Sequence, residues 1–266
     1  MTRIVRAELQ RVLRRRTLLV TALGCLAFAV VSALTVFANA EPSAGGTTVV
    51  SRRGAPPLAA LTGHGGGTEA FVIGASFIGF FVFVTFIAVL AGEFSGGTFR
   101  ALLLRDPHRR RLIVGKLLGL LLVAAGAVAL AEALTFVVSL AAAPGNDIAT
   151  SQWFTLTSAG DALRDYATVF AGVTGWAVFG TTLAVVFRST PLALGVGFAW
   201  AGPFENIVVD SWTTGYRVFP GQVLGSLIRG GTVELGLERA VLTAAVYAVV
   251  AAAVSLWLVS RRDVTA

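Results

Sequence analysis

The stretch EFSGGTFRALLLRDPHRRRLIVGK, residues 93–116, carries six basic residues between two long apolar runs. This is an unusual concentration of charge in a chain that is 56% hydrophobic and only 13% charged. A basic segment in this position fits three interpretations: a signal for membrane topology, a nucleic-acid patch, or a docking surface for another protein. The apolar runs on either side decide the fold class.

The apolar residues come in six blocks that are long enough to cross a membrane. A largely uncharged run of ~18 or more residues spans a hydrocarbon layer of about 30 Å. Such runs exclude the ~10-residue alternating strands of a barrel. The sequence therefore predicts an all-α, polytopic membrane protein with a single transmembrane domain over residues 1–266. The six spans are expected over residues 18–38, 71–92, 112–142, 167–187, 190–209 and 241–259.

The distribution of basic residues predicts the orientation of these spans. With the N-terminus inside, 15 of the 21 Lys and Arg residues fall in segments on the inner side. This is the positive-inside pattern, and with six spans it places both termini in the cytoplasm. Topology thus accounts for most of the net charge of +7. The expected partner is the lipid bilayer, and no nucleic-acid partner is predicted.

The N-terminal segment, residues 1–16, predicts an interfacial helix. Val5, Leu9, Val12 and Leu13 share one helical face, and arginines occupy the other. A merely basic tail is the alternative. The apolar run that follows, with FANAEP after it, resembles a signal peptide. Its 21 residues exceed the usual h-region of ~7–15, so an uncleaved first span is predicted.

Three further segments carry local signals. Residues 39–70 are rich in Gly, Pro, Ser and Thr, which predicts a flexible outer loop without a core. A second outer loop is expected over residues 144–166, and a short outer helix over 219–228 with Pro220 near its start. Gly115 and Gly119 predict close helix packing, either within one chain or between two.

Residues that could carry chemistry are few. His64 and His108 lie in loops on opposite sides, Cys25 lies in the first span, and catalytic or nucleotide-binding motifs are absent. Neither a catalytic residue, nor a metal site, nor a cofactor is predicted in this chain. Glu132 and Glu205 are carboxylates within predicted spans. Two interpretations stay open for them: a pathway or vestibule, or contact with the outer headgroups.

The stretch 93–116 also predicts its own local structure. Thr98 is expected to cap a helix over 98–105, with Phe99, Leu102 and Leu103 on one face. Asp106 is then an N-cap and Pro107 the first residue of the helix that enters the third span. A short amphipathic helix held between two spans suits the transmission of motion from a cytosolic partner.

The same stretch resembles the loop between the second and third spans of the ABC-2 type permeases, the membrane subunits of many bacterial ABC exporters. Pro107 stands one position later than in that pattern, with Asp106 in its place. Two more segments resemble this family: FGTTLAVVFRSTPLALGVGF (179–198), as two spans joined by an Arg-Ser turn, and FPGQVLGSLI (219–228), as a short outer helix. The matching residues in the loop are Glu93, Gly97-Thr98, Leu102-Leu103-Leu104, Arg105, Arg109 and Gly115-Lys116.

The resemblance, which covers about half of the chain, implies a function. The chain would be the permease subunit of an ATP-binding cassette exporter in the bacterial cytoplasmic (inner) membrane, working by alternating access. A second permease subunit and a cytosolic ATPase that binds ATP and Mg would complete it, and this chain would not be an enzyme. The rival interpretation is an ATP-independent six-span channel, carrier or scaffold. The implied contacts with the ATPase are Thr98, Phe99, Arg100, Leu102, Leu103, Arg105, Arg109 and Arg188.

Overall fold

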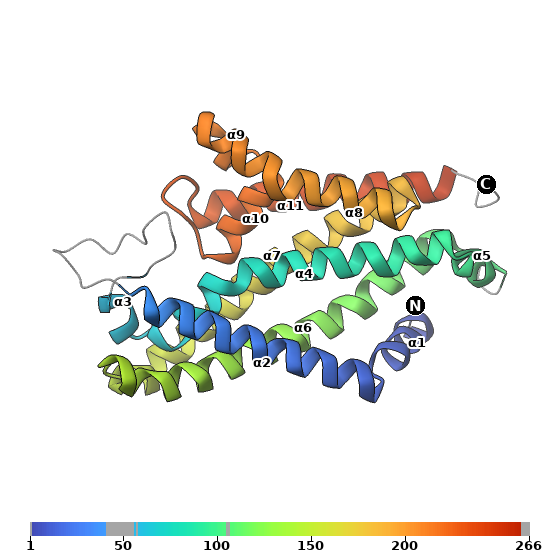
Figure 1. Cartoon of the computed structure of the whole chain (residues 1–266). Helices are drawn as coiled ribbons and strands as arrows, with labels where there is room; N and C mark the ends of the chain where they lie inside the picture. The colour runs from blue at the N-terminus through green and yellow to red at the C-terminus, as the bar shows by residue number, and fades with distance from the viewer. Residues whose placement is uncertain (1, 41–55, 57, 105–106, 262–266) are drawn as a thin grey trace. The chain divides into compact units, whose positions relative to one another are not determined.

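The computed structural model describes residues 2–40, 56, 58–104 and 107–261, and within these ranges every long regular element is a helix (Figure 1). Short 3₁₀ turns at Ala143–Asn146, Ser151–Phe154 and Thr213–Arg217 connect some of them. The α-helices are α1 (Thr2–Val12), α2 (Arg15–Ala38), α3 (Leu58–Thr62), α4 (Gly66–Ser95), α5 (Thr98–Leu103), α6 (Arg109–Ala142), α7 (Leu156–Phe187), α8 (Thr190–Ala199), α9 (Glu205–Ser211), α10 (Pro220–Ile228) and α11 (Leu237–Arg261).

Six helical segments among the described residues are long and apolar enough to cross a membrane. They coincide in order and position with the six predicted spans, so the prediction of a helical protein with six segments able to span a membrane is confirmed for the described residues. The orientation of the spans stays a prediction. The segments are Arg15–Ala38, Gly66–Ser95, Arg109–Asn146, Leu156–Phe187, Thr190–Ser211 and Leu237–Arg261.

Two spans begin well before their apolar runs. α4 starts at Gly66 and α7 at Leu156, so the predicted loop over 144–166 is wrong for its second half. Asp161 and Asp165 consequently lie on a helix. The helices extend because backbone hydrogen bonding continues wherever residues tolerate helical geometry, whereas a hydropathy boundary marks only the apolar portion.

Part of the predicted outer loop over 39–70 is helical. Residues 41–55 and 57 lie outside the described residues, but α3 is helical and its Leu61 is fully buried. The indole Nε1 of Trp153 donates a hydrogen bond to the Leu61 carbonyl oxygen at 2.9 Å. The prediction of a loop without a core is therefore wrong for α3.

The chain forms two compact units. Unit 1 comprises Met1–Leu13, Phe77–Ala124 and Ala171–Ala266, and unit 2 comprises Arg14–Ser76 and Ala125–Phe170. Helices α4, α6 and α7 each contribute one part to each unit. α2 and α3 lie wholly in unit 2, whereas α1, α5 and α8 to α11 belong to unit 1.

Unit 2 has a core at the α3 end of its helices. Phe37 of α2, Leu61 of α3 and Ala70 of α4 pack with Trp153, and Phe136 of α6 lies against this cluster. The Phe136 and Trp153 ring centroids are 6.1 Å apart. The large apolar side chains of α2 that point away from this core, such as Leu19 and Leu23, are exposed, as lipid-facing residues are in a span.

Unit 1 packs around the fully buried Phe83 of α4. The ring centroid of Phe83 lies 5.1 Å from that of Trp176 and 5.7 Å from that of Phe179, both on α7. Such aromatic contacts add about 0.5–1.5 kcal/mol each to the burial of the rings. Between membrane helices this packing, and not expulsion of water, holds the elements together.

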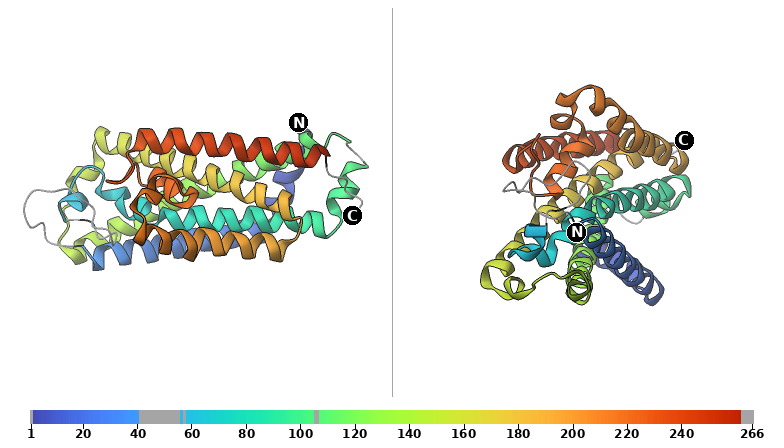
Figure 2. Two further views of the ribbon diagram at one scale, coloured as in Figure 1. Left: turned by 90° about the horizontal axis from the view of Figure 1, so that it is seen from above. Right: turned by 60° about the vertical axis from the view of Figure 1, so that its left-hand side comes forward.

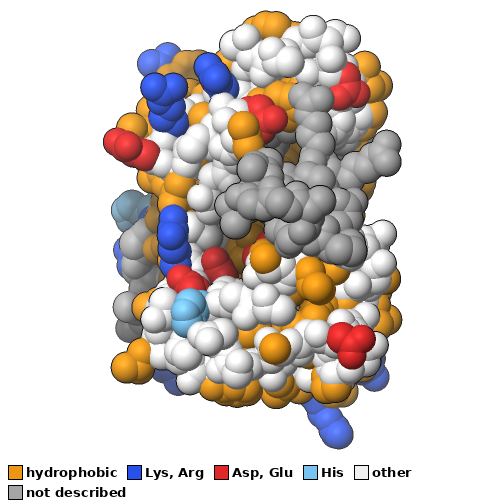
Figure 3. All heavy atoms as spheres, turned by 90° about the vertical axis from the view of Figure 1, so that its left-hand side faces the viewer, with side chains coloured by type: hydrophobic (Ala, Val, Ile, Leu, Met, Phe, Trp, Pro, Cys, Tyr) orange, Lys and Arg blue, Asp and Glu red, His pale blue; other side chains and the backbone are white. Residues whose placement is uncertain are grey.

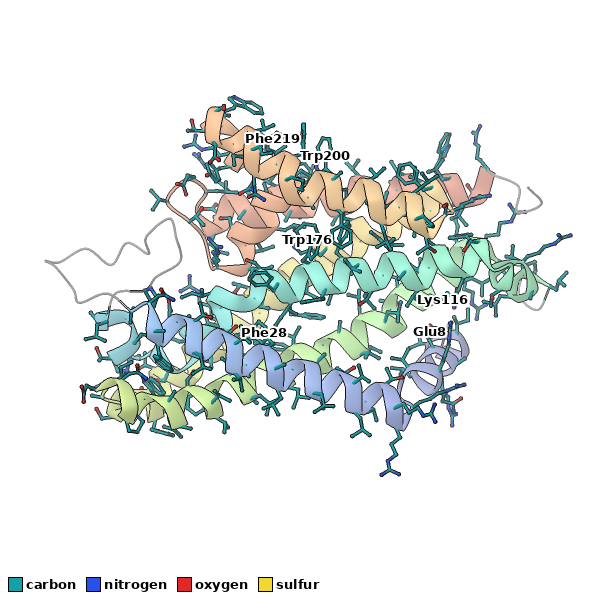
Figure 4. The ribbon with its side chains drawn as sticks, in the orientation of Figure 1. Glu8, Phe28, Lys116, Trp176, Trp200 and Phe219 are labelled. Atoms are coloured by element: carbon teal, nitrogen blue, oxygen red, sulfur yellow. The ribbon has the colours of Figure 1, made fainter. Side chains whose placement is uncertain are left out.

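The fifth span is continuous from α8 to α9 through a widened π-turn at Trp200–Phe204 that contains Pro203. Proline has no N–H to donate and its ring crowds the preceding turn, which accounts for the widening. A short helix at the predicted position 219–228 is present as α10, with Pro220 in its first turn, and its location on the outer side stays a prediction. Trp200 and Phe219, which precede and follow α9, stack edge to face at 6.3 Å (Figure 4).

Candidate functional site

The short helix α5 is fixed to one end of unit 1 by Phe99. This side chain is 1% exposed and packs in a cluster with Leu112 and Ile113 of α6, Val185 of α7 and Leu258 of α11. Its ring centroid is 4.5 Å from that of Phe94 at the end of α4. Figures 1 and 2 show α5 and the C-terminal end of α11 at the same end of this unit. α5 is thus anchored to four spans at once.

The start of α5 differs from the prediction. Gly97, not Thr98, is the N-cap, with φ of 72°, and no side chain caps the helix. Glycine adopts this left-handed conformation without steric penalty, so the chain turns sharply there. The described helix ends at Leu103, and Arg105 and Asp106 lie outside the described residues. Pro107 precedes the next helix, which begins at Arg109, so the prediction that Pro107 is its first residue is wrong.

The two faces of α5 have different surroundings. Phe99, Leu102 and Leu103 pack inward against the cluster, which removes Phe99 from the reach of any partner. Arg100 and Leu104 point outward, and Leu104 is 86% exposed. A protein that docks on α5 therefore meets the side of Thr98, Arg100, Ala101 and Leu104, all of which are exposed. The amphipathic face that the sequence singles out is the anchoring side.

The turn between α7 and α8 lies at the same end of unit 1. Arg188 in this turn has φ of 52°, a left-handed conformation that is uncommon for arginine. Its guanidinium carbon is 5.7 Å from the ring centroid of Phe94, which places it over the aromatic pair beneath α5. Arg109, at the start of α6, is half-buried. Thus Thr98, Arg100, Arg109 and Arg188 gather at one end of this unit.

Below α5, a buried ion-pair network joins three helices of unit 1. Lys116 of α6 donates to Glu93 Oε1 of α4 at 2.8 Å and to Glu8 Oε2 of α1 at 3.0 Å. The side chains of Lys116, Glu93 and Glu8 are each at most 7% exposed. Arg11 of α1 donates a second hydrogen bond to Glu93 Oε1. Figure 4 shows Glu8 and Lys116 pointing toward each other.

The network is electrically balanced, with two carboxylates against one ammonium and one guanidinium. The hydrogen bond to Glu93 raises the pKa of Arg11 above its ordinary value, and the charges of Glu93 and Glu8 act in the same direction. An ammonium or carboxylate taken from water without a partner costs several kcal/mol. Each charge therefore holds the others in place, and the ends of α1, α4 and α6 are tied together.

Two glycines of α6 allow α1 to approach closely enough for these ion pairs. A Cβ atom on Gly115 would lie 2.8 Å from Ile4 Cγ2, and one on Gly119 would lie 2.9 Å from Glu8 Cβ. Both contacts are shorter than side chains tolerate. The close packing predicted for Gly115 and Gly119 thus occurs within one chain, against α1.

The predicted N-terminal helix is confirmed over Thr2–Val12, and its apolar face has a different neighbour from the one expected. Ile4 and Val12 pack against clusters of unit 1, so these two side chains contact protein where the prediction placed the bilayer. Leu13 lies beyond the helix and is exposed. The sequence signal for the ion-pair network was Glu8, the single carboxylate among the arginines of this segment. Its spacing within the helix places it on the buried face.

Glu205 is fully buried in unit 1 and is bonded to the backbone of α10. Its Oε1 accepts the Gly221 N–H and its Oε2 the Gln222 N–H, each at 3.2 Å. These N–H groups belong to the first turn of α10 and have no acceptor within the helix. A carboxylate is well placed there because the helix N-terminus is partially positive. Glu205 thus caps α10. The role of Glu205 in a vestibule stays a prediction.

Glu132 lies in unit 2 on α6. It is half-buried, and its Oε1 is shielded from solvent without a hydrogen-bond partner among the described residues. It lines a cavity of about 610 Å³ between α6 and α7. Among the described residues, no group of three or more His, Cys, Asp and Glu side chains is arranged to hold a metal ion.

A family model of proteins of unknown function, DUF2705, matches residues 26–265. The chain belongs to the DUF2705 family. No curated protein matches the chain. The matched region of this DUF2705 member includes α5, Glu93 and Lys116, whereas α1 with Glu8 and Arg11 precedes it.

Proposed function

We propose that this chain is the membrane-spanning permease subunit of an ATP-binding cassette exporter. The observation that carries the proposal is the construction of α5, a short helix between two spans whose inner side is anchored in the core and whose outer side is free. Phe99 supplies the anchor, and Arg100 and Leu104 the free side. This supports a role in which force applied to α5 from the cytosol reaches the spans.

The anchoring cluster explains how motion would pass from α5 to the spans. Side chains of α6, α7 and α11 surround Phe99, and Phe94 of α4 packs on it. Close-packed interiors transmit displacements because they leave no space to absorb them. A partner that moves α5 would therefore move the same ends of these four spans together.

The network below α5 adds α1 to the moving group. Lys116 and Glu93 join α6 to α4, and Glu8 and Arg11 join α1 to both. Because separating these charges in a buried place is unfavourable, the three helix ends would move as one body. Outward- and inward-facing states would then differ by displacement of this body, as alternating access requires.

The partners follow from this arrangement. The docking surface for a cytosolic ATPase would be Thr98, Arg100, Ala101 and Leu104, extended by Arg109 and Arg188. ATP and Mg would be bound and used by that ATPase. A second permease subunit would complete the assembly in the bacterial cytoplasmic membrane. The basic residues near α5 support a cytoplasmic location for this end under the positive-inside rule.

The experiment is co-purification of the tagged chain with the ATP-binding cassette proteins encoded by neighbouring genes. We expect one of them to co-purify, and Leu104→Glu to abolish the association because it adds charge to the docking surface. Val233→Glu is the matched control, since Val233 is 81% exposed in the loop after α10. If no ATPase is retained, or if both variants retain it equally, an ATP-independent channel or carrier becomes the better account.

A further inference from the structure

Unit 2 contains a cavity with a composition that distinguishes it from ordinary packing gaps. It is an open groove of about 610 Å³ between α6 and α7, with Thr68 of α4 also in its lining and Ala133, Val137 and Leu163 exposed along it. Ala129, Ala133, Phe136 and Val137 of α6 form one apolar wall. Leu163 and Tyr166 of α7 form the other. Ligand sites in proteins have volumes of about 300–1,000 Å³ and mostly apolar walls.

One carboxylate interrupts these apolar walls. Glu132 lines the cavity, and its Oε1 has no hydrogen-bond partner among the described residues. A carboxylate in an apolar place within a membrane protein marks a functional site by default, because its burial is costly unless something pairs with it. Glu205 shows the alternative within the same chain, since both its oxygens are bonded to backbone.

The other charged groups near the cavity strengthen its negative character. Asp165 of α7 accepts a hydrogen bond from Thr68 Oγ1 at 2.6 Å, and Glu69 of α4 lies in the same region of negative charge. Arg164 is exposed, and its positive charge attracts the Asp165 carboxylate. The other basic side chains described in unit 2 are those of Arg14, Arg15, Arg16 and His64. Glu132 forms no ion pair with the described residues.

A second cavity of about 380 Å³ adjoins the first and shares Thr68, Phe136 and Ala162 with it. Trp153 and Phe154 line this second space. Their rings lie 6.1 Å and 5.9 Å from that of Phe136. Aromatic faces attract cations, most strongly where water is excluded. Figure 3 shows the face at the α3 end, where red carboxylates and blue basic side chains are both set among hydrophobic and uncharged surface.

We propose that this cavity binds an amphiphilic organic cation, whose charge pairs with Glu132 and whose apolar body lies against Phe136 and the walls of α6 and α7. Charge complementarity selects this occupant, because a neutral acyl chain would leave Glu132 unpaired and an anion would be repelled. The inference names the substrate class of the proposed exporter and rests on that function only for the step from binding to transport.

The test uses two ions of the same shape and opposite charge, tetraphenylphosphonium and tetraphenylborate, with the purified chain in detergent. Equilibrium binding of each is measured by titration calorimetry. We expect the cation to bind and the anion not to bind. Glu132→Gln should weaken cation binding by about tenfold or more, the effect of losing one well-placed charge pair. Glu238→Gln, in the exposed first turn of α11, should leave binding unchanged.

A second variant tests the position of the ligand. Ala133→Trp fills the cavity with a large ring from the residue next to Glu132 and should also weaken cation binding about tenfold. Thermal melting of each variant verifies that it is folded. Equal binding of both ions, with no effect of Glu132→Gln, would show a lipid-like apolar groove and overturn the proposal. Absent cation binding, or binding that is insensitive to Ala133→Trp, would overturn it as well.

Because binding is measured on the isolated chain, the two proposals can fail separately. Loss of ATPase co-purification leaves the binding result standing, and the cavity would then belong to an ATP-independent carrier. Failure of cation binding leaves the ATPase result standing, and the exporter would then act on another class of substrate.

Discussion

The buried charges of unit 1 and the carboxylate of unit 2 face the same physical problem with opposite outcomes. In unit 1, Lys116 pairs with Glu93 and Glu8, and Glu205 caps α10. In unit 2, Glu132 lines a cavity with one oxygen unbonded. The buried charges of unit 1 therefore stabilise the fold, whereas the carboxylate of Glu132 is available to pair with a ligand. Removing the first kind should harm stability, and removing the second should harm binding.

The largest effect is expected for Lys116→Met. The substitution leaves the carboxylates of Glu93 and Glu8 buried beside an apolar side chain, which costs about 3–5 kcal/mol of unfolding free energy. Reversible unfolding in mixed micelles measures this loss. Arg110→Met is the control, because within the described part of the chain Arg110 makes an exposed hydrogen bond to Ser260, and its loss should change stability by less than ~1 kcal/mol.

The triple variant Glu8→Leu, Glu93→Leu and Lys116→Met tests whether these three side chains pair with one another. Replacing a whole buried ion-pair set with apolar residues is often neutral for stability, so most of the loss should be recovered. A triple variant as unstable as Lys116→Met alone would contradict the pairing of these three side chains.

A smaller effect is expected for Glu205→Ala. It leaves the N–H groups of Gly221 and Gln222 without their acceptor, and loss of such a charged cap costs about 2 kcal/mol. The same unfolding assay measures it. The neighbouring Asn206→Ala loses two exposed hydrogen bonds, one accepted from Gln222 and one donated to the Gly202 carbonyl, and should cost less than ~0.5 kcal/mol. Equal effects of the two variants would argue against Glu205 as the cap.

Gly119→Ala should cost about 1 kcal/mol or more, because the new Cβ would meet Glu8 Cβ at 2.9 Å and push α1 from α6. Gly126→Ala is the matched control on the same helix. A Cβ there meets nothing within 4 Å, so the greater helix propensity of alanine should make that variant slightly more stable. Unchanged stability of Gly119→Ala would show that α1 does not pack at this distance.

The smallest effect on stability is expected for Glu132→Gln. Oε1 of this carboxylate has no hydrogen-bond partner among the described residues, so its removal should change the unfolding free energy by less than ~0.5 kcal/mol. A loss comparable to that of Glu205→Ala would break the comparison, because it would show that Glu132 also serves the fold.

The sequence predicts the spans well and the pairing of charges poorly, for a physical reason. A helix in lipid must be long and apolar, which is a local property that a run such as 71–92 displays directly. The pairing of Lys116 with Glu8 joins residues 108 positions apart, and no local pattern records it. α5 was predicted within two residues, but its anchored and free sides could be told apart only once Phe99 was seen in the core.

The same limit applies to the two intramembrane carboxylates. In the sequence, both Glu132 and Glu205 are carboxylates near the predicted outer ends of spans, where burial of a charge is unfavourable. What distinguishes them is the neighbour brought by tertiary packing, which is the first turn of α10 for Glu205 and an open cavity for Glu132.

The most direct test of the proposed function is a cysteine cross-linking experiment on α5. Cys25 is the single cysteine of the chain, so Cys25→Ser gives a cysteine-free background. Leu104→Cys and Phe99→Cys are introduced separately, and each is treated with a short bifunctional reagent in membranes that contain the co-expressed ATPase. The account predicts a cross-link to the ATPase from position 104 and none from the buried position 99. Cross-links from neither position, or only from position 99, would contradict the docking of an ATPase on the free side of α5.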